Sequence, residues 1–264
     1  MIQRGVMKDR VVVITGASAG IGATLAEDVA RKGAKVVLVA RREKELREVA
    51  ARCGADAHVV VADVTKRADF ARIVASAIER FGRIDVLVNN AGRGITCLPS
   101  ALTDEDVDEM MRVNFKSVLY GMQAVLPHFV ARGRGQVINV SLMLGRVPFT
   151  PVRSAYSAAK AALDSLSASF RIELRAQHPN IHVTVVHPPV VATDFGLHAL
   201  HGGPDSRKLP GAQDVGEVAE VIAAAIEDPR ADVYTRPRAQ QIVVDYYAAE
   251  DMAAAEQPFV MPPR

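Results

Sequence analysis

The chain has 264 residues, of which 49% are hydrophobic, and this is long enough for one α/β domain with a sizeable core. Its net charge is +2 with the basic residues scattered along the sequence, which argues against a nucleic-acid partner. Its two cysteines lack metal-ligand spacing, and the apolar run near the N-terminus is too short for a signal peptide or a membrane span. We therefore expect a cytoplasmic protein with two free thiols, no bound metal and no membrane association.

Strand and helix patterns alternate along the chain. Short β-branched runs predict strands at 11–14, 35–39, 58–62, 84–88, 136–140, 181–186 and 232–235. Helical spacing predicts helices at 21–32, 43–52, 68–81, 103–111, 115–131, 155–176 and 215–227. Because the strands are continuous apolar runs, they are typical of a parallel sheet that is buried on both faces. We predict a single α/β domain over residues 1–264, with a doubly wound, Rossmann-like sheet of about seven strands and helices on both faces.

A glycine-rich turn follows the first predicted strand. Residues 15–22 read Thr-Gly-Ala-Ser-Ala-Gly-Ile-Gly, in which Gly16 permits a tight turn, Gly20 a close approach of a pyrophosphate and Gly22 close helix packing. The N-terminus of the next helix offers free N–H groups to phosphates. The spacing differs from the commoner Gly-x-Gly-x-x-Gly, but its place between a strand and a helix predicts a dinucleotide site. That site takes in Gly16, Ser18, Ala19, Gly20, Ile21 and Gly22.

The end of the second predicted strand bears on the choice of cofactor. An NAD-binding protein usually has Asp or Glu there, whereas this chain has Ala40 followed by Arg41 and Arg42. Guanidinium groups pair with a 2′-phosphate that a carboxylate would repel. We therefore predict NADP(H) over NAD(H). The alternative is that both arginines are only the solvated start of a helix, and it fits Arg42 better than Arg41.

Tyr156 and Lys160 lie four residues apart within the predicted helix 155–176, and so on one face of it. A cation beside a phenol favours its ionised form and lowers its pKa. Such a tyrosine can donate a proton to a carbonyl or take one from an alcohol. On its own the spacing is equally typical of a surface tyrosine with a solvated lysine.

Taken together, the motifs resemble the short-chain dehydrogenase/reductase family over about residues 8–235. They are residues 15–22, the Asn-Asn-Ala-Gly run 89–92, Asn114, Tyr156 and Lys160. The resemblance implies an NADPH-dependent carbonyl reductase that interconverts a ketone or aldehyde and an alcohol, and it implies a homodimer or homotetramer. It makes Tyr156 the catalytic acid/base, Lys160 the residue that holds the nicotinamide ribose and lowers the Tyr156 pKa, and Asn114 part of a water-mediated proton relay. It assigns cofactor contacts to Asp63, Val64, Asn90, Ala91, Gly92, Tyr156, Lys160, Pro188, Val191 and Thr193.

The chain departs from the family pattern in two places beside the expected substrate pocket. Leu142 stands at the position of the catalytic serine, and Ser141 comes one residue early. A one-residue shift turns a side chain to the opposite face, so Ser141 replaces the missing hydroxyl only if the strand bends there. Pro189 stands where the family usually has glycine. One hypothesis is a pocket reshaped for bulky apolar ketones, and the alternative is neutral drift.

The Gly/Pro-containing segment at about 193–212 is expected to be a loop that covers the substrate. Leu142, Met143, Leu144, Pro189 and Phe195 are candidates for an apolar pocket beneath it. The proline-containing tail 257–264 is expected to be extended.

Two rival functions remain open from the sequence. A cofactor-binding protein with weak or no catalysis would fit the missing serine. A nucleotide-sugar epimerase or dehydratase would also use Tyr-x-x-x-Lys, but such chains usually have a different glycine spacing and a larger C-terminal domain.

Overall fold

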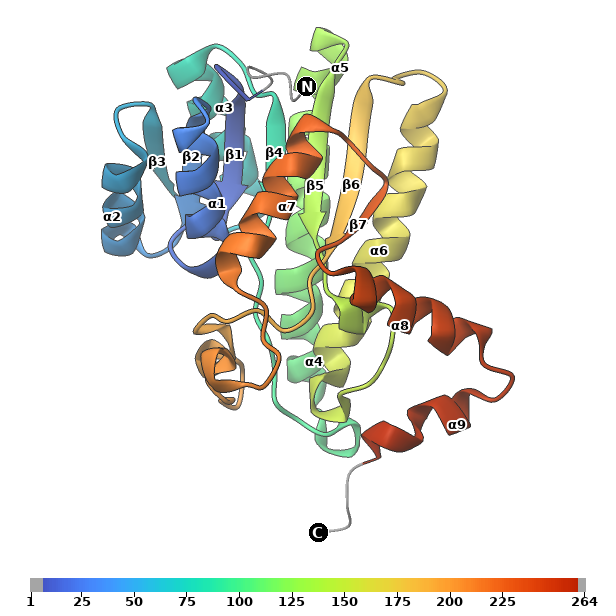
Figure 1. Ribbon diagram of the computed structural model, residues 1–264. Helices are drawn as coiled ribbons and strands as arrows, with labels where there is room; N and C mark the ends of the chain where they lie inside the picture. Colours follow the sequence, from blue (N-terminus) through green and yellow to red (C-terminus); the bar gives the residue numbers. More distant parts are fainter. Residues whose placement is uncertain (1–6, 261–264) are drawn as a thin grey trace.

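A seven-stranded parallel sheet forms the centre of the molecule in the computed structural model, which describes residues 7–260 (Figure 1). The strand order is β3-β2-β1-β4-β5-β6-β7. The strands are β1 (Val11–Thr15), β2 (Lys35–Ala40), β3 (Ala57–Val61), β4 (Val86–Asn89), β5 (Gly135–Val140), β6 (Ile181–His187) and β7 (Asp232–Tyr234). The order reverses between β1 and β4, and ligands of open α/β sheets bind at such a switch point.

Helices cover both faces of the sheet (Figure 1). They are α1 (Gly20–Arg31), α2 (Glu43–Cys53), α3 (Arg67–Phe81), α4 (Asp104–Met111), α5 (Ser117–Arg132), α6 (Ser154–Arg175), α7 (Val215–Glu227), α8 (Pro237–Ala248) and α9 (Met252–Glu256). The seven predicted strands and the seven predicted helices are all confirmed. Their bounds lie within two residues of the predicted ones. The predicted doubly wound α/β fold is therefore correct.

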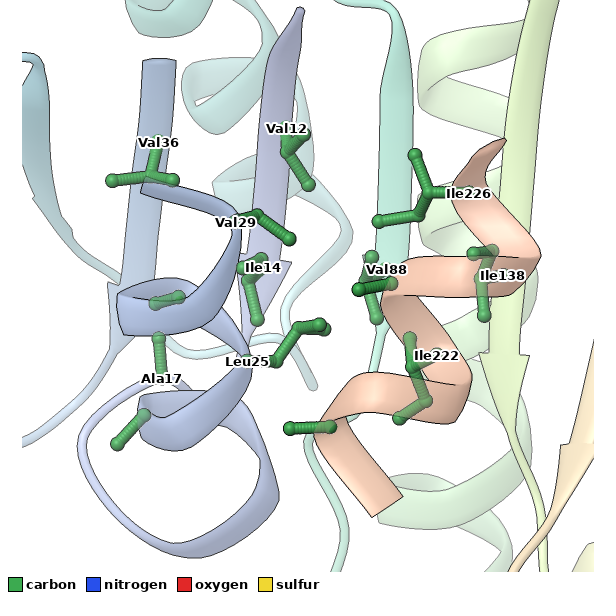
Figure 2. Close-up of a cluster of buried hydrophobic side chains, with 14 of the residues drawn as sticks. Val12, Ile14, Ala17, Leu25, Val29, Val36, Val88, Ile138, Ile222 and Ile226 are labelled. Carbon is green, nitrogen blue, oxygen red and sulfur yellow. The ribbon is translucent and has the colours of Figure 1, made fainter. Parts of the chain in front are cut away.

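Alternate strand residues feed two separate cores. On one face, α1, α2 and α7 cover strand residues such as Ile14, which Figure 2 shows beside Leu25 of α1, and Val88, which it shows beside Ile222 of α7. On the other face, α3, α5 and α6 cover residues such as Val13. All of these side chains are essentially inaccessible to solvent. Burial on both faces explains why the strands are continuous apolar runs.

The C-terminal part of the chain differs from expectation. The structure has α8 and α9 after β7, where no helix was predicted, and they lie at the end of the molecule that holds α4 and the 193–212 segment (Figure 1). The tail predicted to be extended begins with a 3₁₀ turn at Gln257–Phe259, and Phe259 stacks on Phe149 with ring centroids 3.9 Å apart. Residues 261–264 lie outside the described part of the chain.

No helix within residues 7–260 combines the length and the apolar character needed to cross a lipid bilayer.

Candidate active site

The glycine turn after β1 is packed so closely that side chains cannot replace its glycines. Gly16 and Gly20 have φ angles of +68° and +52°, which favour glycine. A Cβ on Gly16 would lie 2.9 Å from the Cα of Ala91, and one on Gly22 would lie 2.6 Å from Asn90 Nδ2. The turn therefore carries no side chains at Gly16, Gly20 and Gly22, where α1 begins.

The segment after β4 is clamped to this turn by hydrogen bonds. Thr15 Oγ1 accepts from the backbone N–H groups of Asn90 (3.0 Å) and Ala91 (3.1 Å), and Asn90 Nδ2 donates to Thr15 O (2.9 Å). At the start of α1, Ala19 has no capping side chain and the first turn has no acidic residue. Free N–H groups and the helix dipole favour an anion there. These features fit the pyrophosphate of a dinucleotide.

The two arginines after β2 lie at the outer edge of the glycine turn. Arg42 reaches over it and donates from Nη2 (3.1 Å) and Nε (3.3 Å) to Ser18 Oγ. Arg41 acts on Asp63: burial alone would raise the pKa of Asp63, but hydrogen bonds from Thr65 and the charge of Arg41 hold it below its ordinary value. Arg42 is also the N-cap of α2, with a side chain that is 44% exposed and an Nη1 that lies 3.9 Å from Glu45 Oε1, so the helix-start interpretation describes it as well.

The remaining predicted cofactor residues line the same end of the sheet. Val64 packs, partly buried, against the α3/α5/α6 core. Thr193 is buried, and its methyl group would lie 3.2 Å from a Cβ on Gly20, so the chain after β6 closes over the glycine turn. Val191 forms a parallel β-bridge with Gln213, and Pro188 O accepts from the N–H of Met143 (3.0 Å).

Asn114 lies in a π-helical turn, Arg112–Lys116, between α4 and α5. Its buried side chain is fixed by Nδ2 donating to Arg93 O (2.9 Å) and by Oδ1 accepting from Arg93 N (3.1 Å). A Cβ on Gly92 would lie 2.9 Å from Asn114 Oδ1 and 3.9 Å from Lys160 Nζ. The glycine thus lets both side chains approach one backbone segment. π-helical turns occur frequently at functional sites.

Tyr156 and Lys160 are both buried on α6, 9% and 2% exposed. Lys160 Nζ donates to Val140 O (2.7 Å) and lies 5.8 Å from the centre of the Tyr156 ring. Burial raises the pKa of Tyr156, with Arg153 the charge that opposes the rise. Burial also lowers the pKa of Lys160 to about 8, against the attraction of Asp164. The effect of Lys160 on the pKa of Tyr156 stays a prediction, because burial and the charge of Arg153 are the influences on that pKa here.

Ser141 and Leu142 continue the alternation of β5. Leu142 has extended backbone angles (φ −161°, ψ 148°) and packs against the cluster that contains Tyr156 and Ile95. Ser141 is buried, and its Oγ has no hydrogen-bond partner among residues 7–260, although it lowers the pKa of Asp164, which burial raises. Its N–H donates to Val186 O (2.8 Å), so the pairing of β5 with β6 continues through Ser141 and its side chain faces away from that of Leu142. This counts against a catalytic role for Ser141.

Two of the five predicted pocket residues gather at Tyr156. Leu142 and Phe195 pack there, and the Phe195 ring centroid lies 5.7 Å from that of Tyr156. Met143 packs toward α8, and Leu144 lines a cavity of about 260 Å³ that Ser154 and Ser157 of α6 also line. The assignment of these two residues to the substrate pocket stays a prediction. Pro189 is half-buried just beyond β6.

The 193–212 segment is held against the chain that follows β4. It contains two 3₁₀ turns, Phe195–His198 and Ser206–Lys208. Leu200 N donates to Gly94 O (2.8 Å) and Leu200 O accepts from Thr96 N (2.9 Å). The segment therefore forms one wall of the space beside Tyr156.

The prediction missed Arg153, which lies at the N-terminus of α6, one helical turn before Tyr156. Its Nη1 donates to Ile95 O (2.8 Å). Its spacing of three residues from Tyr156 was a signal that could have identified it, because such residues are neighbours on a helix.

Comparison with known proteins supports the family resemblance that the sequence motifs indicated. A family model described as "short chain dehydrogenase" matches residues 10–200. The "Uncharacterized oxidoreductase YxnA" of Bacillus subtilis is 38% identical over 245 residues, covering 90% of this chain and 68% of that protein. A solved short chain dehydrogenase from Burkholderia cenocepacia in complex with NADP is 29% identical, with a TM-score of 0.81 over 97% of this chain and 99% of that one. One from Burkholderia phymatum in complex with NAD has a TM-score of 0.85 over 98% and 99% but is 24% identical, so it supports the fold alone.

Proposed function

Because the chain belongs to the short-chain dehydrogenase family, we propose that it is an NADPH-dependent oxidoreductase that reduces a ketone or aldehyde to an alcohol, reversibly. The observation that carries the proposal is the convergence of three buried polar side chains, Asn114, Tyr156 and Lys160, beside a dinucleotide turn. Polar groups are rarely buried unless they are paired or have a task.

The choice of NADPH rests on the arginines. Arg42 contacts Ser18 of the glycine turn and the charge of Arg41 acts on Asp63, and two guanidinium groups after β2 suit a ribose 2′-phosphate better than a carboxylate would. The Burkholderia cenocepacia protein, whose structure contains NADP, is consistent with this choice.

The chemistry divides between cofactor and protein. When bound, the nicotinamide supplies the hydride that reduces the carbonyl carbon. Tyr156 donates its phenolic proton to the carbonyl oxygen. Lys160 and Asn114, on either side of Gly92, return a proton to Tyr156.

Leu142 weakens this machinery in one respect. It offers no hydrogen bond to the oxygen that gains charge, so Tyr156 stabilises that oxygen without the usual hydroxyl partner. This observation favours a second candidate function, a protein that binds NADPH with little turnover.

The test is to measure oxidation of NADPH and of NADH with ketones of graded size, using Tyr156→Phe as the inactive control. We expect NADPH to be preferred and Tyr156→Phe to lose turnover but keep cofactor binding. A clear preference for NADH would contradict the role of the arginines. Tight NADPH binding with no turnover on any carbonyl would support the second candidate.

A further inference from the structure

Arg153 is a half-buried cation without an acidic partner among residues 7–260. Its one side-chain hydrogen bond among these residues is the donation from Nη1 to Ile95 O, and a guanidinium has five N–H donors. Burial lowers its pKa, and the group that opposes this is Tyr156, not a carboxylate. A half-buried charge with no acidic partner is unfavourable, so this arrangement calls for a binding partner.

The guanidinium lies in the wall of the space beside Tyr156. A Cβ on Gly94 would meet Arg153 Nη1 at 3.2 Å and Phe195 Cε1 at 3.0 Å. Phe195 in turn packs against the ring of Tyr156. The positive charge, the aromatic ring and the phenol therefore border the same region.

A second polar group without a partner lies beside this cation. A Cβ on Gly203 would lie 3.2 Å from Arg153 Nη2 and 3.1 Å from Thr96 Oγ1. The Thr96 hydroxyl is buried, with no hydrogen-bond partner among the described residues. The same point lies 2.6 Å from Gly196 O, so the guanidinium, the hydroxyl and a backbone carbonyl all border it. Planar guanidinium groups match carboxylates in particular, because they bind both oxygens.

We propose that Arg153 determines specificity by binding a carboxylate of the substrate, so that the protein acts on oxo acids rather than on neutral ketones. The inference rests on the proposed reductase function and names its substrate class. The carbonyl lies at Tyr156 and the carboxylate at Arg153, one helical turn away, so only a few bonds separate the two groups. The carboxylate is unchanged in the reaction: the carbonyl carbon gains a hydride from NADPH, its oxygen gains the Tyr156 proton, and the products are a hydroxy acid and NADP⁺.

This proposal replaces the hypothesis of a pocket for bulky apolar ketones. Leu142 and Phe195 still contribute apolar surface beside Tyr156, which suits the hydrocarbon part of an oxo acid.

The test compares short oxo acids with their methyl esters at equal chain length, with NADPH in excess. For the wild type we expect kcat/KM to be at least about 10-fold higher on the acid, mainly through KM. Loss of one partner of a buried charge pair typically costs enough to lower kcat/KM by about 10²-fold. Arg153→Met should therefore lose about that factor on the acid and little on the ester, and Arg153→Lys should recover part of it.

Arg207→Met is the matched control. It also removes one positive charge, but Arg207 lies in the 193–212 segment, is exposed and is paired with Asp205. It should leave the acid-to-ester ratio of kcat/KM unchanged.

Equal kcat/KM on acid and ester in the wild type would overturn the proposal, as would equal losses on both in Arg153→Met, which would make Arg153 a structural tether of Ile95. Failure of the proposed function gives a different result, no NADPH oxidation with either compound. In that case the binding proposal is read from thermal unfolding: the acid, and not the ester, should raise the Tm of the wild type but not of Arg153→Met. No such difference would also overturn it.

Discussion

The ammonium group of Lys160 donates a 2.7 Å hydrogen bond to the backbone carbonyl of Val140, the last residue of β5. The contact holds the lysine at the carboxyl end of the sheet, beside Gly92 and below Tyr156. One hydrogen bond does not replace the water around an ammonium group. Burial consequently lowers the pKa of Lys160 from 10.5 to about 8.

This shift predicts a pH-dependent difference in stability between the wild type and Lys160→Met. Between about pH 8 and pH 10.5 the unfolded chain binds the lysine proton while the folded chain has released it. The cost of burying the charge is full below about pH 8 and disappears as the pH rises to 10.5. The free energy of unfolding of the wild type, minus that of the variant, should rise across this window. Urea unfolding at several pH values checks it, and parallel curves would contradict the buried lysine pKa.

The glycine turn predicts a loss of cofactor binding in Gly22→Ala. The new methyl group would clash with Gly16 O and lie 2.6 Å from Asn90 Nδ2, so the turn and the segment after β4 must separate. NADPH affinity should fall by at least about 10-fold, together with a lower Tm. Gly82→Ala is the control, because a Cβ there meets nothing within 4 Å and costs only the backbone strain of a positive φ, about 1 kcal/mol. Unchanged NADPH affinity in Gly22→Ala would argue against the turn as the pyrophosphate site.

The sequence was sufficient for the sheet, the helices that cover it and the glycine turn, because those features are periodic or local. The seven buried strands are continuous apolar runs, and Gly16 and Gly20 have the positive φ values that such turns require. Helix α8 was missed because its apolar face is short: Ala239, Val243 and Tyr246 are its only buried residues, and the last two pack on a distant segment around Val147.

Side-chain environments depend on contacts that no local pattern reveals. Met143 and Leu144 are neighbours of Leu142 in the sequence, yet the 3₁₀ turn at Met143–Gly145 directs them away from Tyr156. The Tyr156 pKa likewise depends on how deeply α6 is buried, and spacing alone suggested the opposite direction. Arg153 becomes visible as an unpaired cation only once its surroundings are known.

The position of Leu142 predicts that Leu142→Ser will increase turnover. Leu142 packs on the Tyr156 side of β5, so a hydroxyl there would face the oxygen that Tyr156 protonates. A hydrogen bond to a developing oxyanion typically contributes about 10²–10³ in kcat, and partial alignment should give at least about 10-fold. Steady-state kcat on one carbonyl substrate checks this. Ser141→Ala is the control and should change kcat little, because the side chain of Ser141 faces away from that of Leu142. Equal kcat in Leu142→Ser and the wild type would sink the idea.

The contact between Arg42 and Ser18 predicts which substitutions change cofactor preference. Arg42→Ala removes a guanidinium that is hydrogen-bonded to Ser18 of the glycine turn, whereas Arg41→Ala removes one that makes no hydrogen bond to residues 7–260. KM for NADPH should rise about 10- to 10²-fold in Arg42→Ala and less in Arg41→Ala, because a positioned guanidinium loses less conformational freedom on pairing with a phosphate. KM for NADH should stay unchanged in both variants, since that cofactor has no 2′-phosphate. Arg47→Ala, which removes an exposed charge from α2 that is paired with Glu43, controls for the change in net charge. Equal increases of KM for NADPH and NADH in Arg42→Ala would mean that Arg42 supports the turn and does not read the 2′-phosphate.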